Sequence, residues 1–134
     1  LAYLILTDQF PRNMFRGDPR AFATDAKARD AARRALTENW DQDAPAPERQ
    51  FFYLPFEHSE DPEDQALAVE CFTTRIEGPE TALHARAHQQ IIQRFGRFPF
   101  RNAALGRAST PEEEEFMQNG GYGAIVRALQ AQGG

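Results

Sequence analysis

The fold class is decided by residues 61–96, which read DPEDQALAVECFTTRIEGPETALHARAHQQIIQRFG. Asp61 suits a helix N-cap, Pro62 suits the first helical position, and acidic residues follow it, as is typical of a helix start. Apolar residues then recur every three or four positions, which indicates amphipathic helices. We predict one helix that Gly78-Pro79 ends and a second that Gly96 ends. The first carries Ala68, Cys71, Phe72 and Ile76 on one face, and the second carries His84, Ala87, His88, Ile91, Ile92 and Phe95.

Helix signals extend on both sides of this stretch. Thr110-Pro111-Glu112-Glu113 is a capping box that opens a short helix with Phe116 and Met117 inward, and a last helical turn or two follows near Leu129. Thr24 is a predicted N-cap for a helix that fades near Asn39-Trp40. The buried face of that helix is almost entirely alanine, which lets a neighbouring helix approach closely.

Two segments carry proline next to apolar residues. Residues 1–9 fit a helix or a short strand, and we expect the element to end at Phe10, because a residue before proline disfavours the helical conformation. Residues 12–23 are then expected to be irregular. The dense apolar run of residues 51–56 predicts a buried helix kinked by Pro55, and we expect Trp40 and these aromatic residues to lie in the core.

Strand signals are almost absent, so the predicted fold is all-α. With 134 residues, the chain is expected to form a single domain, residues 1–134. It opens at Leu1 without methionine, and we expect that its natural N-terminal segment is missing here. No apolar run approaches the length of about 20 residues that a membrane span needs.

Composition narrows the class of protein. The net charge of −5 disfavours wide nucleic-acid binding, which needs a basic face. The single cysteine, Cys71, excludes an intrachain disulfide framework. We expect a cytoplasmic protein with neither nucleic acid nor membrane as a partner. Of the 15 basic residues only Lys27 is lysine, and the planar guanidinium of arginine suits carboxylate or phosphate recognition.

Two similar loops at opposite ends of the chain are the first candidate site. The candidate ligand-binding residues are Arg12, Asn13, Arg16, Arg97, Arg101, Asn102 and Arg107. Each loop places arginines, an asparagine and a glycine after an apolar segment, and such loops usually present groups to a ligand. The alternative is that these arginines cap helix ends or pair with nearby acids. If they form an anion clamp, the two loops must lie on the same side of the molecule.

Several blocks of the sequence resemble one bacterial family, the domain of unknown function 924. The blocks are Asp8 to Asn13, Arg16-Gly17, Pro19 to Phe22, Leu54 to Asp61, Arg94 to Pro99 and Arg101-Asn102, and the resemblance covers residues 1–119. It implies an all-helical, tetratricopeptide-like arrangement of antiparallel hairpins and implies no reaction. Many family members have histidine at the position of Phe100. The tail, residues 122–134, has no counterpart in the family pattern.

The block around His58 is the second candidate site. His58 is a candidate general base with Glu60 or Asp61 orienting its ring, and His88 is a candidate of the same kind. The alternatives are a buried His58 that bonds to a backbone carbonyl, and an Asp61 that serves only as a cap. Ser59 has no nucleophile-elbow sequence around it.

His84 and His88 are spaced four apart, as metal ligands on a helix can be, but no glutamate stands between them. We therefore expect no metal and no cofactor. We expect His88 to line a cavity with its ring bonded to an acid or a carbonyl. The sequence favours a domain that binds a small anionic ligand or an acidic peptide end. A hydrolase or transferase with a histidine–carboxylate pair, and a protein-interaction module, remain the alternatives.

Overall fold

A computed structural model describes residues 1–133, except for the side chains of Thr7, Phe10, Asn13 and Ala46. Within this part of the chain all regular structure is helical and there is no strand, so the prediction of an all-α fold is confirmed. The elements in chain order are α1 (Ala2–Leu4), the π-helical turn η1 (Ile5–Gln9), α2 (Phe10–Met14), η2 (Pro19–Phe22), α3 (Asp25–Thr37), η3 (Trp40–Asp43), α4 (Ala46–Arg49), η4 (Gln50–Phe52), α5 (Leu54–Glu57), α6 (Pro62–Thr74), α7 (Pro79–Phe95), η5 (Pro99–Arg101), α8 (Pro111–Gln118) and α9 (Gly121–Gly133).

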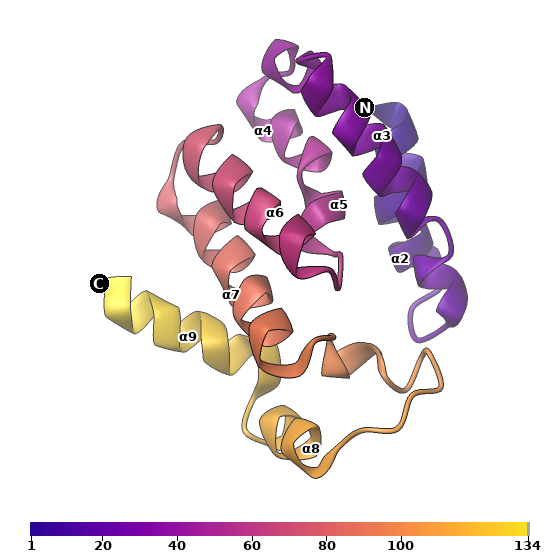
Figure 1. Ribbon diagram of the computed structural model, residues 1–134, viewed down its shortest axis with the longest axis vertical. Coiled ribbons are helices and arrows are strands. Elements are labelled where there is room, and N and C mark those ends of the chain that lie inside the picture. The colour runs from indigo at the N-terminus through magenta and orange to yellow at the C-terminus, as the bar shows by residue number, and fades with distance from the viewer. Residues whose placement is uncertain (134) are drawn as a thin grey trace.

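The two longest predicted helices form the centre of the fold. α6 and α7 lie side by side and antiparallel, with α3 and α5 on one side and α9 on the other (Figure 1). Asp61 caps α6 by accepting a 2.8 Å hydrogen bond from the amide of Glu63. Gly96 ends α7 in the left-handed conformation, at φ 74°, where an L side chain would be strained. α6 itself ends at Thr74, earlier than the predicted boundary.

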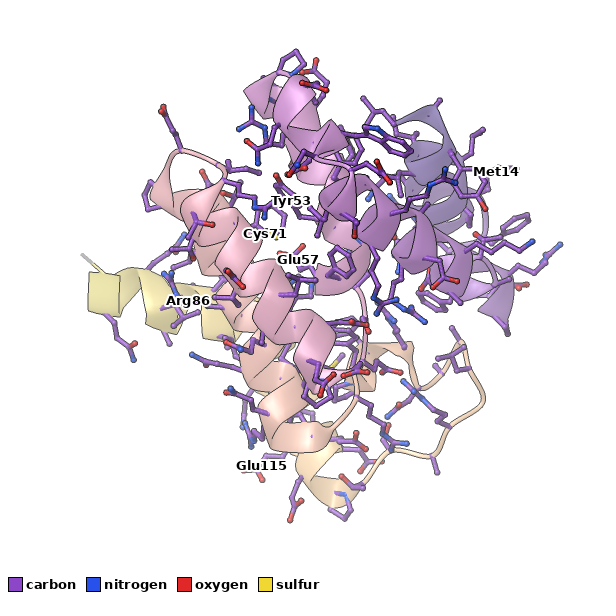
Figure 2. All side chains as sticks on the ribbon, turned by 45° about the horizontal axis from the view of Figure 1, so that its top comes forward. Met14, Tyr53, Glu57, Cys71, Arg86 and Glu115 are labelled. Atoms are coloured by element: carbon purple, nitrogen blue, oxygen red, sulfur yellow. The ribbon has the colours of Figure 1, made fainter. Side chains whose placement is uncertain are left out.

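The main core lies between α3, α5, α6 and α7. Ala28, Ala32 and Ala35 of α3 are buried as predicted, while Ala31 is partly buried. Ala32 and Ala35 share one core cluster with the fully buried rings of Tyr53 and Phe56. Figure 2 shows Tyr53, Glu57 and Cys71 inside the helical layers, whereas Met14 projects from the surface. The core therefore surrounds the short helix α5, from which Glu57 and His58 follow directly.

The prediction for the N-terminal segment was wrong in two respects. The helix does not end at Phe10, because α2 runs to Met14. The segment predicted to be irregular is so only at residues 15–18 and 23, since η2 covers Pro19–Phe22. Pro11 occupies one of the first two positions of α2, where a missing amide is tolerated, and the wider turn η1 precedes it.

Proline and backbone conformation also explain two aromatic positions. Residues 50–57 form two short pieces, η4 and α5, rather than one kinked helix, because Pro55 starts a new helix at one of its first two positions.

Trp40 is 47% exposed and not part of the core. Asn39 takes the left-handed conformation and turns the chain outward after α3, so the Trp40 ring lies on the surface over the Arg34 guanidinium.

The C-terminal helices extend the fold beyond the prediction. The capping box of α8 is present, with reciprocal bonds between Thr110 and Glu113. Phe116 is buried, but Met117 is 44% exposed, since the inward face of α8 carries Glu113 and Phe116 and the next residue is turned away from it. α9 is a full helix of 13 residues that packs along α7. No helix among residues 1–133 is long and apolar enough to cross a membrane.

Candidate functional site

The corner between α5 and α6 carries the central histidine of the site. α5 ends at Glu57 and Asp61 caps α6, so the corner is fixed at both ends. The side-chain amide of Gln65 donates hydrogen bonds to the backbone carbonyls of Glu57 (2.7 Å) and Ser59 (2.6 Å), on either side of His58. His58 is therefore presented from a rigid corner.

Asp8, from η1, orients the His58 ring. Its Oδ1 lies 3.0 Å from His58 Nδ1, and Asp8 is 2% exposed. Because Nδ1 faces a carboxylate, it carries the ring proton, and Nε2 is left as an acceptor. Burial lowers the pKa of His58 more than the hydrogen bond to Asp8 raises it, so the ring is neutral near pH 7.

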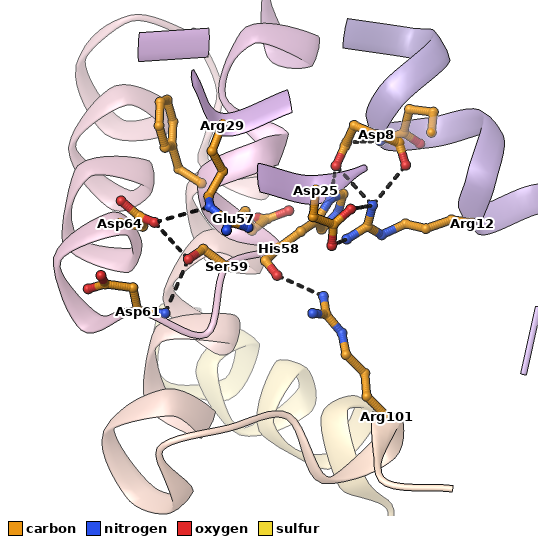
Figure 3. A network of polar contacts seen from close by, with 12 residues as sticks. Asp8, Arg12, Asp25, Arg29, Glu57, His58, Ser59, Asp61, Asp64 and Arg101 are labelled. Atoms are coloured by element: carbon orange, nitrogen blue, oxygen red, sulfur yellow. Dashed lines mark hydrogen bonds and ion pairs between the residues drawn. The ribbon is translucent and has the colours of Figure 1, made fainter. Parts of the chain in front are cut away.

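Arg12 binds two carboxylates at once (Figure 3). It donates to Asp8 Oδ1 at 2.9 Å and makes a bidentate contact with Asp25, with both distances 2.9 Å. Burial raises the pKa of Asp8, but the hydrogen bond from His58 and the charge of Arg12 lower it overall. The Asp8 carboxylate is therefore held ionised beside the histidine.

Arg101 reaches the same corner from the opposite end of the chain (Figure 3). One of its terminal nitrogens donates to the His58 carbonyl at 2.8 Å, and its guanidinium lies 4.6 Å from the ring centres of both Phe22 and Phe98. The Arg12 guanidinium lies 5.5 Å from the same Phe22 ring. The prediction that the two arginine segments lie on the same side of the molecule is confirmed.

His58, Asp25 and Arg101 line a cleft of about 540 Å³ between α3 and the α5–α6 corner. Asp64 organises its far wall, because it accepts a 2.6 Å bond from Arg33 and a 2.7 Å bond from the Ser59 hydroxyl and lies 3.7 Å from Arg29. The cleft therefore contains both charges, and most of its arginines are already paired with acids. Its charged lining consists of three arginines and five acids: Arg29, Arg33, Arg101, Asp25, Asp30, Glu60, Asp61 and Asp64.

A second group of polar residues lies behind the corner, on the side of α7 and α9. His88 Nδ1 donates to the backbone carbonyl of His84 at 2.8 Å and lies 3.8 Å from Glu57 Oε1. His84 Nδ1 is bonded to the Tyr122 hydroxyl. Burial and the charge of Asp8 raise the pKa of Glu57 to about 8, and burial lowers the pKa of His88 to about 3. Among residues 1–133 no three His, Cys, Asp or Glu side chains are grouped as metal ligands.

Comparison with known proteins identifies the family. The model of the family described as bacterial protein of unknown function (DUF924) matches residues 1–121. The chain belongs to the DUF924 family. A solved structure, that of the protein of unknown function ATU0120 from Agrobacterium tumefaciens, is 44% identical with a TM-score of 0.85. The match covers 89% of this chain and 66% of that protein, and no curated protein matches.

In this DUF924 protein, two further predicted ligand-binding arginines are paired with acids, as Arg12 is. Arg97 pairs with Glu113 at 2.7 Å and so ties the loop after α7 to the capping box of α8. Arg107 pairs with Glu60 at 2.9 Å and donates to Asn102 Oδ1 at 3.0 Å. These residues hold the loop that presents Arg101.

The other predicted site residues divide between the surface and local structure. Arg16 is exposed, and the side chain of Asn13 lies outside the described residues. Glu60 and Asp61 do not orient His58, because Glu60 binds Arg107 and the amide of Phe98 while Asp61 caps α6. Phe100 is exposed.

Sequence reasoning did not place Asp8 or Asp25 beside His58, because both come from segments distant from it in the chain. Glu57 belongs to the block that the sequence singled out, but its burial was not foreseen. The signal in the sequence was the position of Asp8 directly before the block Gln9 to Asn13. A residue next to that block lies in the same region of the fold as Arg12. Burial, which distinguishes Glu57, is visible only in the fold.

Proposed function

We propose that this protein binds a small anionic ligand, a carboxylate or a phosphate, at Arg101 in the cleft between α3 and the α5–α6 corner. The observation that supports it is that Arg101 is 9% exposed, lines the cleft and has no carboxylate partner among residues 1–133. A buried cation without a counter-ion is costly, and an anion in the cleft would compensate that cost.

The geometry around Arg101 favours a ligand. Of its five N–H donors, one is used by the His58 carbonyl, and the rings of Phe22 and Phe98 flank the guanidinium and fix its orientation. Burial and the charge of Arg12 lower its pKa to about 10, so the group stays protonated at neutral pH. Arg12, Arg97 and Arg107, which have acidic partners, support the walls instead. A free metabolite and the end of an acidic peptide could each supply the carboxylate or phosphate group that Arg101 would bind.

Replacing Arg101 with methionine should weaken binding of inorganic phosphate or acetate at least tenfold. Methionine keeps the apolar contact with Phe22 and Phe98 and removes the charge. The affinity is measured by titration calorimetry, with thermal shift as a check, because a ligand that binds the folded state raises its apparent stability. The control is Arg16→Met, which removes the same charge from an exposed position and should change the affinity less than about threefold. Equal losses in the two variants would contradict the proposal.

The second candidate function is acid–base catalysis on such a ligand, and the hydrogen bond between Asp8 and His58 favours it. A carboxylate that fixes the histidine tautomer leaves Nε2 to accept a proton, as in many hydrolases and transferases. His58 lines the same cleft as Arg101, so the ligand and the base would meet there. In this function the acid that orients His58 is Asp8, whereas the sequence suggested Glu60 or Asp61.

Turnover of p-nitrophenyl phosphate and p-nitrophenyl acetate tests this second function. The rate should rise with pH to a plateau as His58 loses its proton, and His58→Gln should lower it about 100-fold or more. His84→Gln, outside the cleft, should leave it unchanged. A rate that His58→Gln does not alter, or no turnover of either ester class, excludes catalysis and leaves binding alone.

The arrangement of the helices and the composition support two further expectations within this proposal. The antiparallel pair α6–α7 is consistent with a tetratricopeptide-like arrangement, in which a protein-interaction role is common. The net charge of −5 and the single buried cysteine are consistent with a cytoplasmic protein that does not bind nucleic acid.

A further inference from the structure

A second cavity lies on the other side of the α5–α6 corner from the Arg101 cleft. Its volume is about 200 Å³, and η4, α5, α6, α7 and α9 contribute to its walls. Its polar lining is Gln50, Glu57, Thr81, His84 and Tyr122, and its apolar lining is Leu54 and Phe72. None of these seven residues lines the Arg101 cleft, so the two sites can be tested separately.

Glu57 is an acid without a counter-ion in this cavity. It is 4% exposed, and no described residue donates a hydrogen bond to its carboxylate. The nearest basic group, His88 Nδ1, is 3.8 Å away and already donates to the His84 carbonyl. The nearby charge that acts on it among the described residues is Asp8, a second acid.

Thr81 is the second unsatisfied group. Its hydroxyl is buried and has no hydrogen-bond partner among the described residues. The Tyr122 hydroxyl is bonded to His84 Nδ1 but keeps an oxygen lone pair. A carboxylate and two hydroxyl oxygens therefore line one cavity, and buried polar groups normally have partners.

We propose that the Glu57 cavity binds a small primary amine in its ammonium form. An ammonium group has three N–H donors and no acceptor, which matches the acceptors of Glu57, Thr81 and Tyr122. Its positive charge neutralises the buried carboxylate, and the rings of Tyr122 and Phe72 suit a short alkyl chain and a cation. An anion is disfavoured here because Glu57 and Asp8 repel it.

Binding should be coupled to ionisation of Glu57. The titratable groups around Glu57 are His84 and His88 of α7, Tyr122 of α9 and Asp8. In the protein without ligand, burial and the charge of Asp8 raise the pKa of Glu57 to about 8. Below that pH the ammonium must displace the Glu57 proton. The affinity should therefore rise about tenfold per pH unit between pH 6 and 7, with release of close to one proton.

The test is titration calorimetry of the whole chain with n-propylamine, and with n-propanol as a neutral ligand of the same shape. Propylamine should bind in the millimolar range, propanol at least tenfold more weakly, and Glu57→Gln should reduce propylamine binding at least tenfold. Glu70→Gln, which neutralises an exposed acid on α6, should change it less than twofold. Circular dichroism verifies that each variant is folded.

Three results would overturn the proposal: equal binding of propylamine and propanol, unchanged binding in folded Glu57→Gln, or no binding of propylamine in the millimolar range. Arg101→Met should leave propylamine binding intact. A loss of phosphate binding in that variant with propylamine binding retained separates this site from the proposed anion site.

Discussion

Replacing Phe56 with alanine should destabilise the fold by about 3–5 kcal/mol, because a large buried ring leaves a cavity that the surrounding helices fill only in part. Phe56 is fully buried in the main core, and the guanidinium of Arg33 lies 5.6 Å from its ring centre. The ring also anchors α5 directly before Glu57 and His58. The free energy of unfolding is measured by urea denaturation followed by circular dichroism.

Phe100→Ala is the control for this change. Phe100 is 40% exposed and only stacks on Phe98, with ring centres 5.3 Å apart. We expect a loss below about 1 kcal/mol. A similar loss for the two variants would mean that Phe56 does not lie in the principal core.

Replacing Arg12 with methionine should cost about 3 kcal/mol at pH 7, since it leaves two carboxylates without their cation. The two acids differ little in burial, with Asp8 2% and Asp25 8% exposed. The matched control is Arg20→Met. Arg20 also makes a bidentate contact with an aspartate, but its side chain is 67% exposed and that of Asp18 38%. Solvent therefore screens this pair, and we expect a much smaller loss of stability than for Arg12→Met.

Lowering the pH should reduce the difference in the free energy of unfolding between Arg12→Met and the parent protein. In the folded parent protein the pKa of Asp8 is lowered from its ordinary value of 3.8. The contribution of Asp8 to the free energy of unfolding is therefore present above pH 3.8 and is lost as the pH falls further. In the variant Asp8 lacks the Arg12 charge and accepts a proton at higher pH, which relieves the penalty. Urea denaturation of both proteins at pH 7 and near pH 4 tests this expectation. A stability difference between variant and parent that is larger near pH 4 than at pH 7 would contradict it.

The parts of the fold that local chemistry decides were predictable. The caps at Asp61 and Thr110 and the stop at Gly96 are properties of a few adjacent residues, and each is confirmed. The N-terminal segment was not predictable in the same way. A proline ordinarily breaks a helix, but Pro11 follows the wider π-helical turn, and whether such a turn forms depends on tertiary contacts.

The site was predictable in its location but not in its pairings. The arginine blocks and His58 pointed to the region where Arg12, Arg101 and His58 meet. The partners depend on which helix faces which, so Asp8 rather than Glu60 lies against His58. Glu57 differs from a surface acid only by its burial, which no local pattern reports.

The π-helical turn η1 has a consequence for how sequences of this kind can be aligned. An α-helix advances about 100° per residue, so one residue fewer between Asp8 and Pro11 would rotate the Asp8 carboxylate by that angle relative to Arg12. The pairing of Asp8 with His58 thus depends on the number of residues in this turn as well as on their identity. A relative that keeps every polar residue but lacks one position here would lose the contact between Asp8 and His58. In an alignment, a gap in this short segment would therefore indicate a larger change at the candidate site than most substitutions around it.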